Sequence, residues 1–185
     1  LYTFIYSKLD NIEKHVQSLS LTIDNFRDFY KPSKEKKLTT VNDSISHALG
    51  IVETAMQTKL ISINKKYNST TELELFTHEL MQVVLNILKN SQDSFEEMNI
   101  KEPIINITTR DIEHGVRIDI SDNGGGISDE IITKIFDPYF STKMEKNGTG
   151  LGLYMSKLII EEHHNGKFTC KNNNDGACFT IEIYY

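Results

Sequence analysis

The chain has 185 residues, of which 38% are hydrophobic and 25% are charged, a balance typical of a globular domain in water. Its formal net charge is −6, which argues against a broad nucleic-acid-binding surface. No apolar run reaches the roughly 18 residues that would cross a membrane.

The first thirty residues predict one long helix with an apolar seam. Apolar residues recur at alternating spacings of three and four, at Tyr2, Ile5, Leu9, Ile12, Val16, Leu19, Ile23, Phe26 and Tyr30. Pro32 ends the pattern. Such a helix is about 45 Å long, more than a small domain needs for its own core. We therefore expect the seam to pack against another helix or subunit; the alternative is an amphipathic helix lying on its own domain.

The next segments predict short elements joined by polar connections. In order, they are a charged linker at 31–37, a strand at 38–41, a helix with an apolar face from 45 to 55, a strand at 60–64 and a polar loop at 65–69. The candidates for the N-cap of this helix are Asn42, Asp43 and Ser44.

A second strong helix is predicted from Thr77. Asn86, Asn90 and Asp93 fall at i, i+4 and i+7, so they project from one side of it. Asparagine is unfavourable inside a helix, which suggests that these oxygens are gathered for a ligand. Oxygen ligands suit Mg²⁺, which takes its remaining ligands from waters and phosphates. The alternative is the polar outer face of a surface helix.

The remaining chain predicts a hairpin, a helix and a final pair of strands. The segments are strands at 104–109 and 116–120, a helix from about 149 to 163 capped by Gly166, and strands at 167–171 and 178–185. Cys170 and Cys178 are interpreted as reduced thiols rather than a disulfide across the last hairpin.

Asp122 ends one of these strands and is followed by a glycine cluster at 124–126. A carboxylate at this position can accept a hydrogen bond from the exocyclic amine that distinguishes adenine from guanine. Gly124 and Gly126 allow a sharp turn and a close approach to a flat base.

A second glycine cluster at 148–152 precedes a predicted helix. Backbone N–H groups at a helix N-terminus form an anion site suited to phosphates. Thr149 offers a hydroxyl, and Lys143 and Lys146 offer point charges for the outer phosphates. The sequence has neither a P-loop nor a dinucleotide-binding glycine motif.

In this order, the motifs resemble the ATP-binding catalytic domain of sensor histidine kinases, in the GHKL ATPase superfamily, over roughly residues 38–185. The similar segments are an N box at 78–94, a G1 box at 122–126, an F box at 136–143, a G2 box at 148–153 and a weaker glycine box at 176–179. Residues 1–31 resemble the second helix of the dimerisation and phosphotransfer hairpin.

The resemblance implies a fold and a division of the chain. We expect an α/β (α+β) two-layer sandwich of the GHKL ATPase type, with a mixed, largely antiparallel sheet and helices on one face, preceded by one long helix. The expected domains are a partial dimerisation hairpin at 1–31 and an ATP-binding catalytic domain at 32–185.

The resemblance also implies binding of ATP and Mg²⁺ and transfer of the γ-phosphoryl group to a histidine, for relay to a response-regulator receiver domain. It assigns catalytic roles to Asn86, Asn90 and Lys143, with Asn90 as the Mg²⁺ ligand. The expected nucleotide-binding residues are Asn86, Asn90, Asp93, Asp122, Gly124, Gly126, Ile127, Tyr139, Thr142, Lys143, Gly148, Thr149, Gly150, Leu151 and Gly152. A homodimer through the N-terminal helix of the full-length protein, a cytoplasmic location and the absence of nucleic-acid and membrane contacts are implied as well.

The chain departs from a whole kinase in one respect. Neither His15 nor His78 lies in the histidine-acid-proline context of a phosphoacceptor, and the chain begins at Leu1, so we expect a piece whose acceptor helix lies upstream. Asn86 stands where hydrolytic relatives have a glutamate, and asparagine cannot act as a base at neutral pH, which favours transfer over hydrolysis. The alternatives are a GHKL-type ATPase and a nucleotide-binding or dimerisation module without kinase activity.

Overall fold

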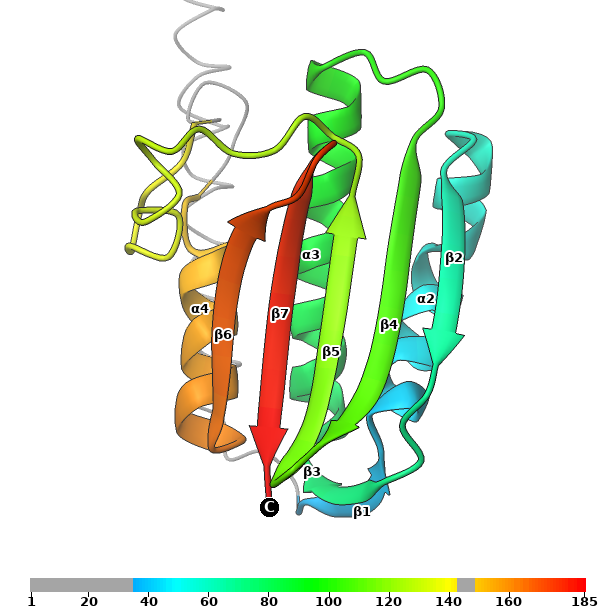
Figure 1. Cartoon of the computed structure of the whole chain (residues 1–185), viewed down its shortest axis with the longest axis vertical. Helices are drawn as coiled ribbons and strands as arrows, with labels where there is room; N and C mark the ends of the chain where they lie inside the picture. Colours follow the sequence, from blue (N-terminus) through cyan, green and yellow to red (C-terminus); the bar gives the residue numbers. More distant parts are fainter. Residues whose placement is uncertain (1–34, 143–148) are drawn as a thin grey trace, which may run out of the picture.

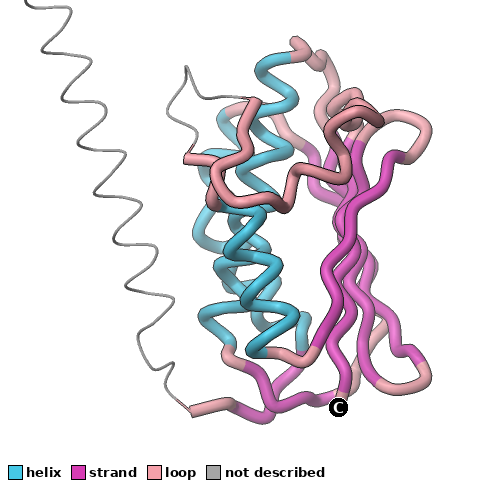
Figure 2. The backbone as a smooth tube through the Cα atoms, turned by 90° about the vertical axis from the view of Figure 1, so that its left-hand side faces the viewer, coloured by secondary structure: helices cyan, strands magenta, loops and turns pink. Residues whose placement is uncertain are grey.

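The computed structural model describes residues 35–142 and 149–185, so the helix predicted over 1–31 lies outside the described residues. The helices and strands are β1 (Lys37–Thr40), α2 (Val41–Thr58), β2 (Ser62–Tyr67), β3 (Glu72–Leu75), α3 (Thr77–Glu97), β4 (Ile104–Ile112), β5 (Gly115–Asp122), α4 (Gly152–Leu158), the π-helix η2 (Ile159–His163), β6 (Gly166–Asn172) and β7 (Ala177–Tyr184). The helices lie on one side and the large sheet on the other (Figures 1 and 2), which confirms the predicted two-layer sandwich.

The large sheet has the strand order β2-β4-β5-β7-β6. β2 pairs with β4 in parallel and every other neighbouring pair is antiparallel, so the mixed, largely antiparallel sheet is confirmed. Alternate residues of the central strands face the helices, as the period of two requires. The core side chains from these strands are Ile105, Ile107, Val116, Ile118, Ile120, Phe179, Ile181 and Ile183.

Among the described residues the longest helix is α3, which lies behind the centre of the sheet (Figure 1). Its buried residues are Leu80, Val83, Val84, Ile87, Leu88, Ser91 and Phe95, a helical repeat that turns one face to the sheet. Asn86 and Asn90 are not part of this buried face and are partly exposed. One helix therefore supplies both core packing and a polar stripe.

Several boundaries differ from the sequence prediction by one or more residues, and one strand was not predicted. The cap of α2 is Thr40, two residues before the first predicted candidate, in a capping box with Asp43. Residues 65–67, predicted as loop, continue β2, because all three pair with β4 and exposed lysines are common on an edge strand. The strand β3 was not predicted, because four residues with two buried leucines are too short to distinguish from loop.

The end of the helix after the second glycine cluster also differs. The α-helix begins at Gly152 rather than Thr149, and its last turn is the π-helix η2. Asn165, not Gly166, takes the left-handed conformation that reverses the chain, with φ of 48°. Gly166 instead begins β6, where a Cβ would lie 2.3 Å from the carbonyl oxygen of Glu182.

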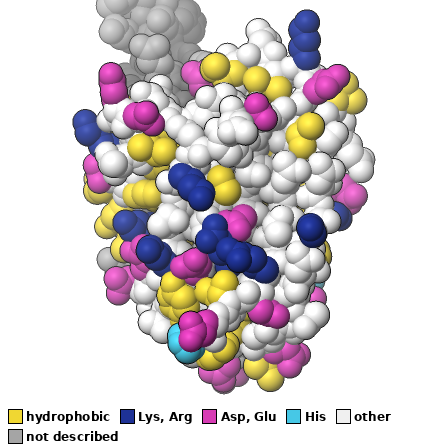
Figure 3. All heavy atoms as spheres, in the orientation of Figure 1, with side chains coloured by type: hydrophobic (Ala, Val, Ile, Leu, Met, Phe, Trp, Pro, Cys, Tyr) yellow, Lys and Arg dark blue, Asp and Glu magenta, His cyan; other side chains and the backbone are white. Residues whose placement is uncertain are grey.

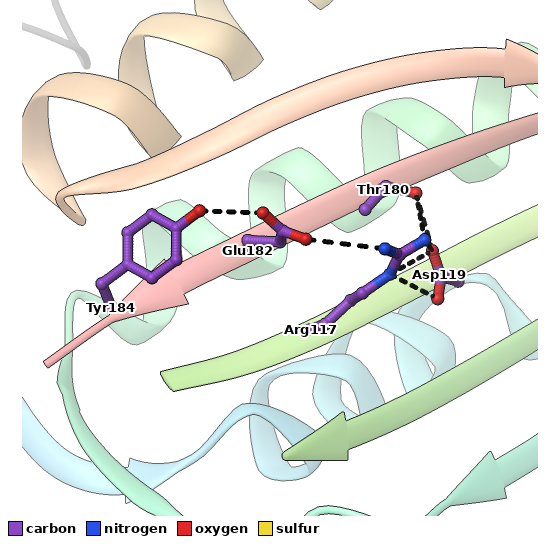
Figure 4. A network of polar contacts seen from close by, with 5 residues as sticks. All are labelled: Arg117, Asp119, Thr180, Glu182 and Tyr184. Atoms are coloured by element: carbon purple, nitrogen blue, oxygen red, sulfur yellow. Dashed lines mark hydrogen bonds and ion pairs between the residues drawn. The ribbon is translucent and has the colours of Figure 1, made fainter. Parts of the chain in front are cut away.

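The face of the sheet turned away from the helices is polar, with acidic and basic side chains interspersed (Figure 3). Arg117 donates to both carboxylate oxygens of Asp119 at 2.8–3.0 Å, and its Nη1 lies 3.5 Å from Glu182 (Figure 4). Thr180 donates to Asp119 at 2.6 Å. Burial tends to raise the pKa of Asp119, but the hydrogen bonds from Arg117 and Thr180 outweigh it and lower the pKa. This network links β5 to β7 on the face of the sheet that is turned away from the helices.

Both cysteines are free, as predicted, and half-buried. Burial raises the pKa of Cys170 to about 12, which keeps the thiol protonated and unreactive near neutral pH. None of the helices in the part of the chain that the structure describes is both long and apolar enough to traverse a lipid bilayer.

Candidate functional site

A cavity of about 740 Å³ lies between α3, the segment after β5 and the start of α4. This volume falls within the range of small-molecule and cofactor sites. Its lining residues are Asn86, Lys89, Asn90, Ser91, Asp93, Ser94, Glu96, Glu97, Met98, Asp122, Gly126, Ile127, Ser128, Ile131, Ile135, Phe140, Ser141, Thr142, Thr149, Gly150, Gly152, Leu153, Ala177 and Phe179. The N-box, G1-box, F-box and G2-box segments therefore meet around one space.

Asp122 lies at one end of this cavity, with only 6% of its surface exposed. Its Oδ1 accepts hydrogen bonds from the backbone N–H groups of Gly124 at 2.9 Å and Ala177 at 3.2 Å. Its Oδ2 accepts a hydrogen bond from the Ser91 hydroxyl at 2.8 Å. The carboxylate is held by three donors from three different segments.

The glycines after Asp122 are required for two different reasons. Gly125 and Gly126 have φ of 86° and 77°, which favours glycine. Gly124 does not have a positive φ, although the chain bends there as expected; a Cβ on it would lie 2.8 Å from the Ser94 hydroxyl. Gly124 also does not line the cavity, whereas Gly126 and Ile127 do.

At the other end of the cavity, the second glycine cluster packs against the F-box segment. Gly150 has φ of 66°, and a Cβ on it would lie 2.4 Å from the carbonyl carbon of Tyr139, which is itself left-handed with φ of 65°. Tyr139 is exposed and Leu151 is buried, and neither lines the cavity. Thr142, Thr149, Gly150 and Gly152 do line it, and Lys143 and Gly148 lie outside the described residues.

The start of α4 meets Asn86. A Cβ on Gly152 would lie 2.5 Å from Asn86 Oδ1, and the Asn86 amide donates to Ser156 on α4 at 2.9 Å. Among the described residues no side chain caps the N-terminus of α4. Its first N–H groups are therefore suited to an anionic ligand.

The polar stripe of α3 faces the cavity, since Asn86, Asn90 and Asp93 all line it. Lys89 forms an ion pair with Asp93 at 2.5 Å, one turn apart on the helix. No three His, Cys, Asp or Glu side chains of the described residues converge on a metal-sized space. The Asn90 amide oxygen nevertheless fits Mg²⁺ when waters and phosphates supply the remaining ligands.

Sequence reasoning missed the apolar wall of the cavity and Ser91. The wall includes Ile131, Ile135, Phe140 and Phe179. Apart from Phe140, which lies in the predicted F box, these residues read as ordinary core positions, because nothing in their spacing shows which of them border an empty space. Ser91 could have been noticed, because it directly follows Asn90 in the predicted N box.

Comparison with known proteins gives consistent matches. Residues 77–184 match the family model described as histidine kinase-, DNA gyrase B- and HSP90-like ATPase. The chain is 28% identical to the sensor histidine kinase ZraS of Escherichia coli K12, over 91% of this chain and 35% of that protein. It is 30% identical to the signal transduction histidine-protein kinase AtoS of the same strain, over 94% and 28%. The chain thus spans about a third of the length of these curated relatives.

Solved structures show the same fold. The catalytic domain of histidine kinase ThkA matches with a TM-score of 0.71 and 29% identity, over 81% of this chain and 95% of that one. ThkA in complex with the response regulator protein TrrA matches with a TM-score of 0.70 and 25% identity, over 91% of this chain and 48% of that one.

Proposed function

Because the chain belongs to the family of histidine kinase-, DNA gyrase B- and HSP90-like ATPases, whose membership implies ATP binding, we propose that its cavity binds Mg-ATP for phosphoryl transfer to a histidine of a two-component sensor kinase. A response-regulator receiver domain then takes the phosphoryl group. The relatives that match are sensor kinases, and one of them is bound to a response regulator. We extend the proposal to a cytoplasmic homodimer joined through the N-terminal helix.

The observation that carries the proposal is that one end of the cavity offers a hydrogen-bond acceptor and the other end offers hydrogen-bond donors. Asp122 offers a fixed acceptor for the adenine amine, and the uncapped start of α4 offers N–H donors for the phosphates. Asn90, with Asp93 one turn away, is assigned to the side of the cavity that holds Mg²⁺. The metal, when bound, supplies neutralisation of phosphate charge. Gly124 and Leu151 support the loops, and Lys143, Gly148 and Tyr139 retain their predicted roles at the phosphates and the lid.

Asn86 separates this proposal from a hydrolytic ATPase. Its amide nitrogen already donates to Ser156, and an amide has no proton-accepting strength at neutral pH. The chain therefore has no base at this position to activate water, so transfer to a protein histidine is favoured. We expect slow ATP turnover by the chain alone; rapid turnover would support the ATPase alternative.

The test is nucleotide binding by Asp122→Asn, measured calorimetrically on the whole chain with Mg-ATP and Mg-ITP. An asparagine can keep Oδ1 for Gly124 and Ala177, and its NH₂ then faces the base, where it repels an amine and favours a 6-oxo group. We expect the free energy of ATP binding to become about 1–3 kcal/mol less favourable, while the preference for ITP over ATP rises. Asp119→Asn, on the opposite face of the same strand, is the matched control. Equal ATP binding by both variants would overturn the assignment.

A further inference from the structure

Beneath the proposed adenine end of the cavity, Ser91 and Asp122 form a buried polar pair. Ser91 is 2% exposed and its Oγ lies 2.8 Å from Asp122 Oδ2. An ionised carboxylate can only accept, so the hydroxyl is the donor. Ser91 and Asp122 both line the cavity, although they come from α3 and β5. The pair is therefore close enough to a ligand to influence what binds.

Within residues 35–142 and 149–185, the hydrogen bonds of Asp122 leave one acceptor position open. A carboxylate has about four lone-pair positions. Gly124 and Ala177 occupy two on Oδ1, and Ser91 occupies one on Oδ2. The remaining position is on Oδ2, and its direction depends on where the Ser91 hydroxyl holds that oxygen. A ligand can place one N–H group there.

The same hydrogen bond fixes the hydroxyl of Ser91. Its one proton is committed to Asp122, so it is not available to a carbonyl oxygen on a ligand. A 6-oxo purine would meet an acceptor on Asp122 and no free donor on Ser91. A 6-amino purine would meet a correctly directed acceptor. The pair thus discriminates between the two by its hydrogen-bond pattern.

Ser94, one turn further along α3, offers an instructive contrast. Its hydroxyl also donates at 2.8 Å, but to the backbone carbonyl of Gly124. Ser94 therefore anchors the loop that follows Asp122, whereas Ser91 touches the carboxylate itself. Ser94 thus supports the loop, and Ser91 contacts the acceptor.

We propose that Ser91 is a positioning residue that determines purine specificity: its hydroxyl directs Asp122 Oδ2 toward the 6-amine of the base. This inference rests on the proposed function, since it concerns the nucleotide of the same cavity. It assigns to Ser91 a role in selecting the base that is separate from a role in stability.

The test uses the whole chain with Ser91→Ala, Ser91→Thr and Ser94→Ala. Each variant is titrated with Mg-ATP and with the Mg complex of purine riboside triphosphate, which has hydrogen in place of the 6-amine. We expect Ser91→Ala to lose roughly 5- to 30-fold in affinity for ATP, with less than about a twofold change for the analogue. Ser91→Thr keeps a hydroxyl and should retain the preference for ATP. Ser94→Ala should change both affinities by the same factor.

Three results would overturn the inference: equal losses for both nucleotides in Ser91→Ala, no loss for either, or the same selective loss in Ser94→Ala. An equal loss would indicate a structural role only. Failure of the proposed function has a different signature, because the unsubstituted chain would then bind neither nucleotide. A chain that binds ATP while Ser91→Ala keeps full discrimination refutes the role of Ser91 alone.

Discussion

A cluster around two histidines should make the fold less stable in mild acid. Its members are Phe76, Glu79, His163 and His164. His164 is 3% exposed, and in the described structure neither of its ring nitrogens has a hydrogen-bond partner. Its Nε2 lies 3.7 Å from the Glu79 carboxylate, which is 2.9 Å from His163 Nδ1. The Phe76 ring packs edge-on to His164 at 5.8 Å. The imidazole is thus buried in its neutral form.

Burial, with smaller contributions from the charges of Lys36 and His163, lowers the pKa of His164 from 6.5 to about 4. Between these values the unfolded chain takes up a proton that the folded chain does not bind. The free energy of unfolding therefore falls as the pH drops from 6.5 toward 4, and His164 adds no pH dependence above pH 7. The full loss is about 3 kcal/mol, and about 2 kcal/mol of it is reached at pH 5.

The assay is urea unfolding at pH 7.5, 6 and 5 for the unsubstituted chain and for His164→Leu, which cannot titrate. We expect the leucine variant to gain about 2 kcal/mol relative to the unsubstituted chain between pH 7.5 and pH 5. The control variant is His114→Gln, which removes an exposed histidine far from this cluster in the sequence. If Glu79 controlled the imidazole instead, acid would stabilise the unsubstituted chain relative to His164→Leu. Parallel curves or that reversed order would refute the reasoning.

Two further substitutions test the backbone and the open sheet face. Gly150→Ala places a Cβ 2.4 Å from the Tyr139 carbonyl carbon at a positive φ, so we expect a loss of at least about 1 kcal/mol in urea unfolding. The control Gly50→Ala, in α2 with nothing within 4 Å of the added Cβ, should instead gain about 0.5–1 kcal/mol; a similar effect of both would contradict the geometry. Arg117→Ala removes the cation that lowers the pKa of Asp119, and should cost about 1 kcal/mol at pH 7. This cost should shrink as the pH falls through the lowered folded pKa of Asp119, because protonated Asp119 no longer needs the cation; a cost that stays constant throughout the acid range in which Asp119 takes up its proton would disprove the pairing.

The sheet and α3 could be predicted because their patterns are long and regular. β5 alternates buried and half-buried residues from Val116 to Asp122, β7 does so except at the buried Thr180, and α3 repeats its apolar face over 21 residues. The stripe formed by Asn86, Asn90 and Asp93 was predictable for the same reason, since helical geometry alone puts the three on one side. These are properties of single elements, which sequence periodicity reports directly.

What could not be predicted depends on contacts between elements. The pairing of β2 with β4 turns Lys65 and Lys66, which look like loop residues, into a strand. The Ser91–Asp122 hydrogen bond joins residues 31 positions apart, and no spacing rule connects them. Phe179 borders the cavity only because β7 lies next to β5. Each of these features requires the three-dimensional arrangement.

The contacts of α3 explain why glycines recur in both clusters. Gly124 leaves room for Ser94, and Gly152 leaves room for Asn86, so two of the glycines are required by side chains of α3 rather than by their own φ. The α3 helix contacts Asp122 through Ser91 and α4 through Asn86 and Ser156. The two loops around the cavity are therefore held at fixed positions by one helix whose other face is packed in the core. It follows that enlarging a small residue on the cavity side of α3 should disturb both ends of the site before it disturbs the fold.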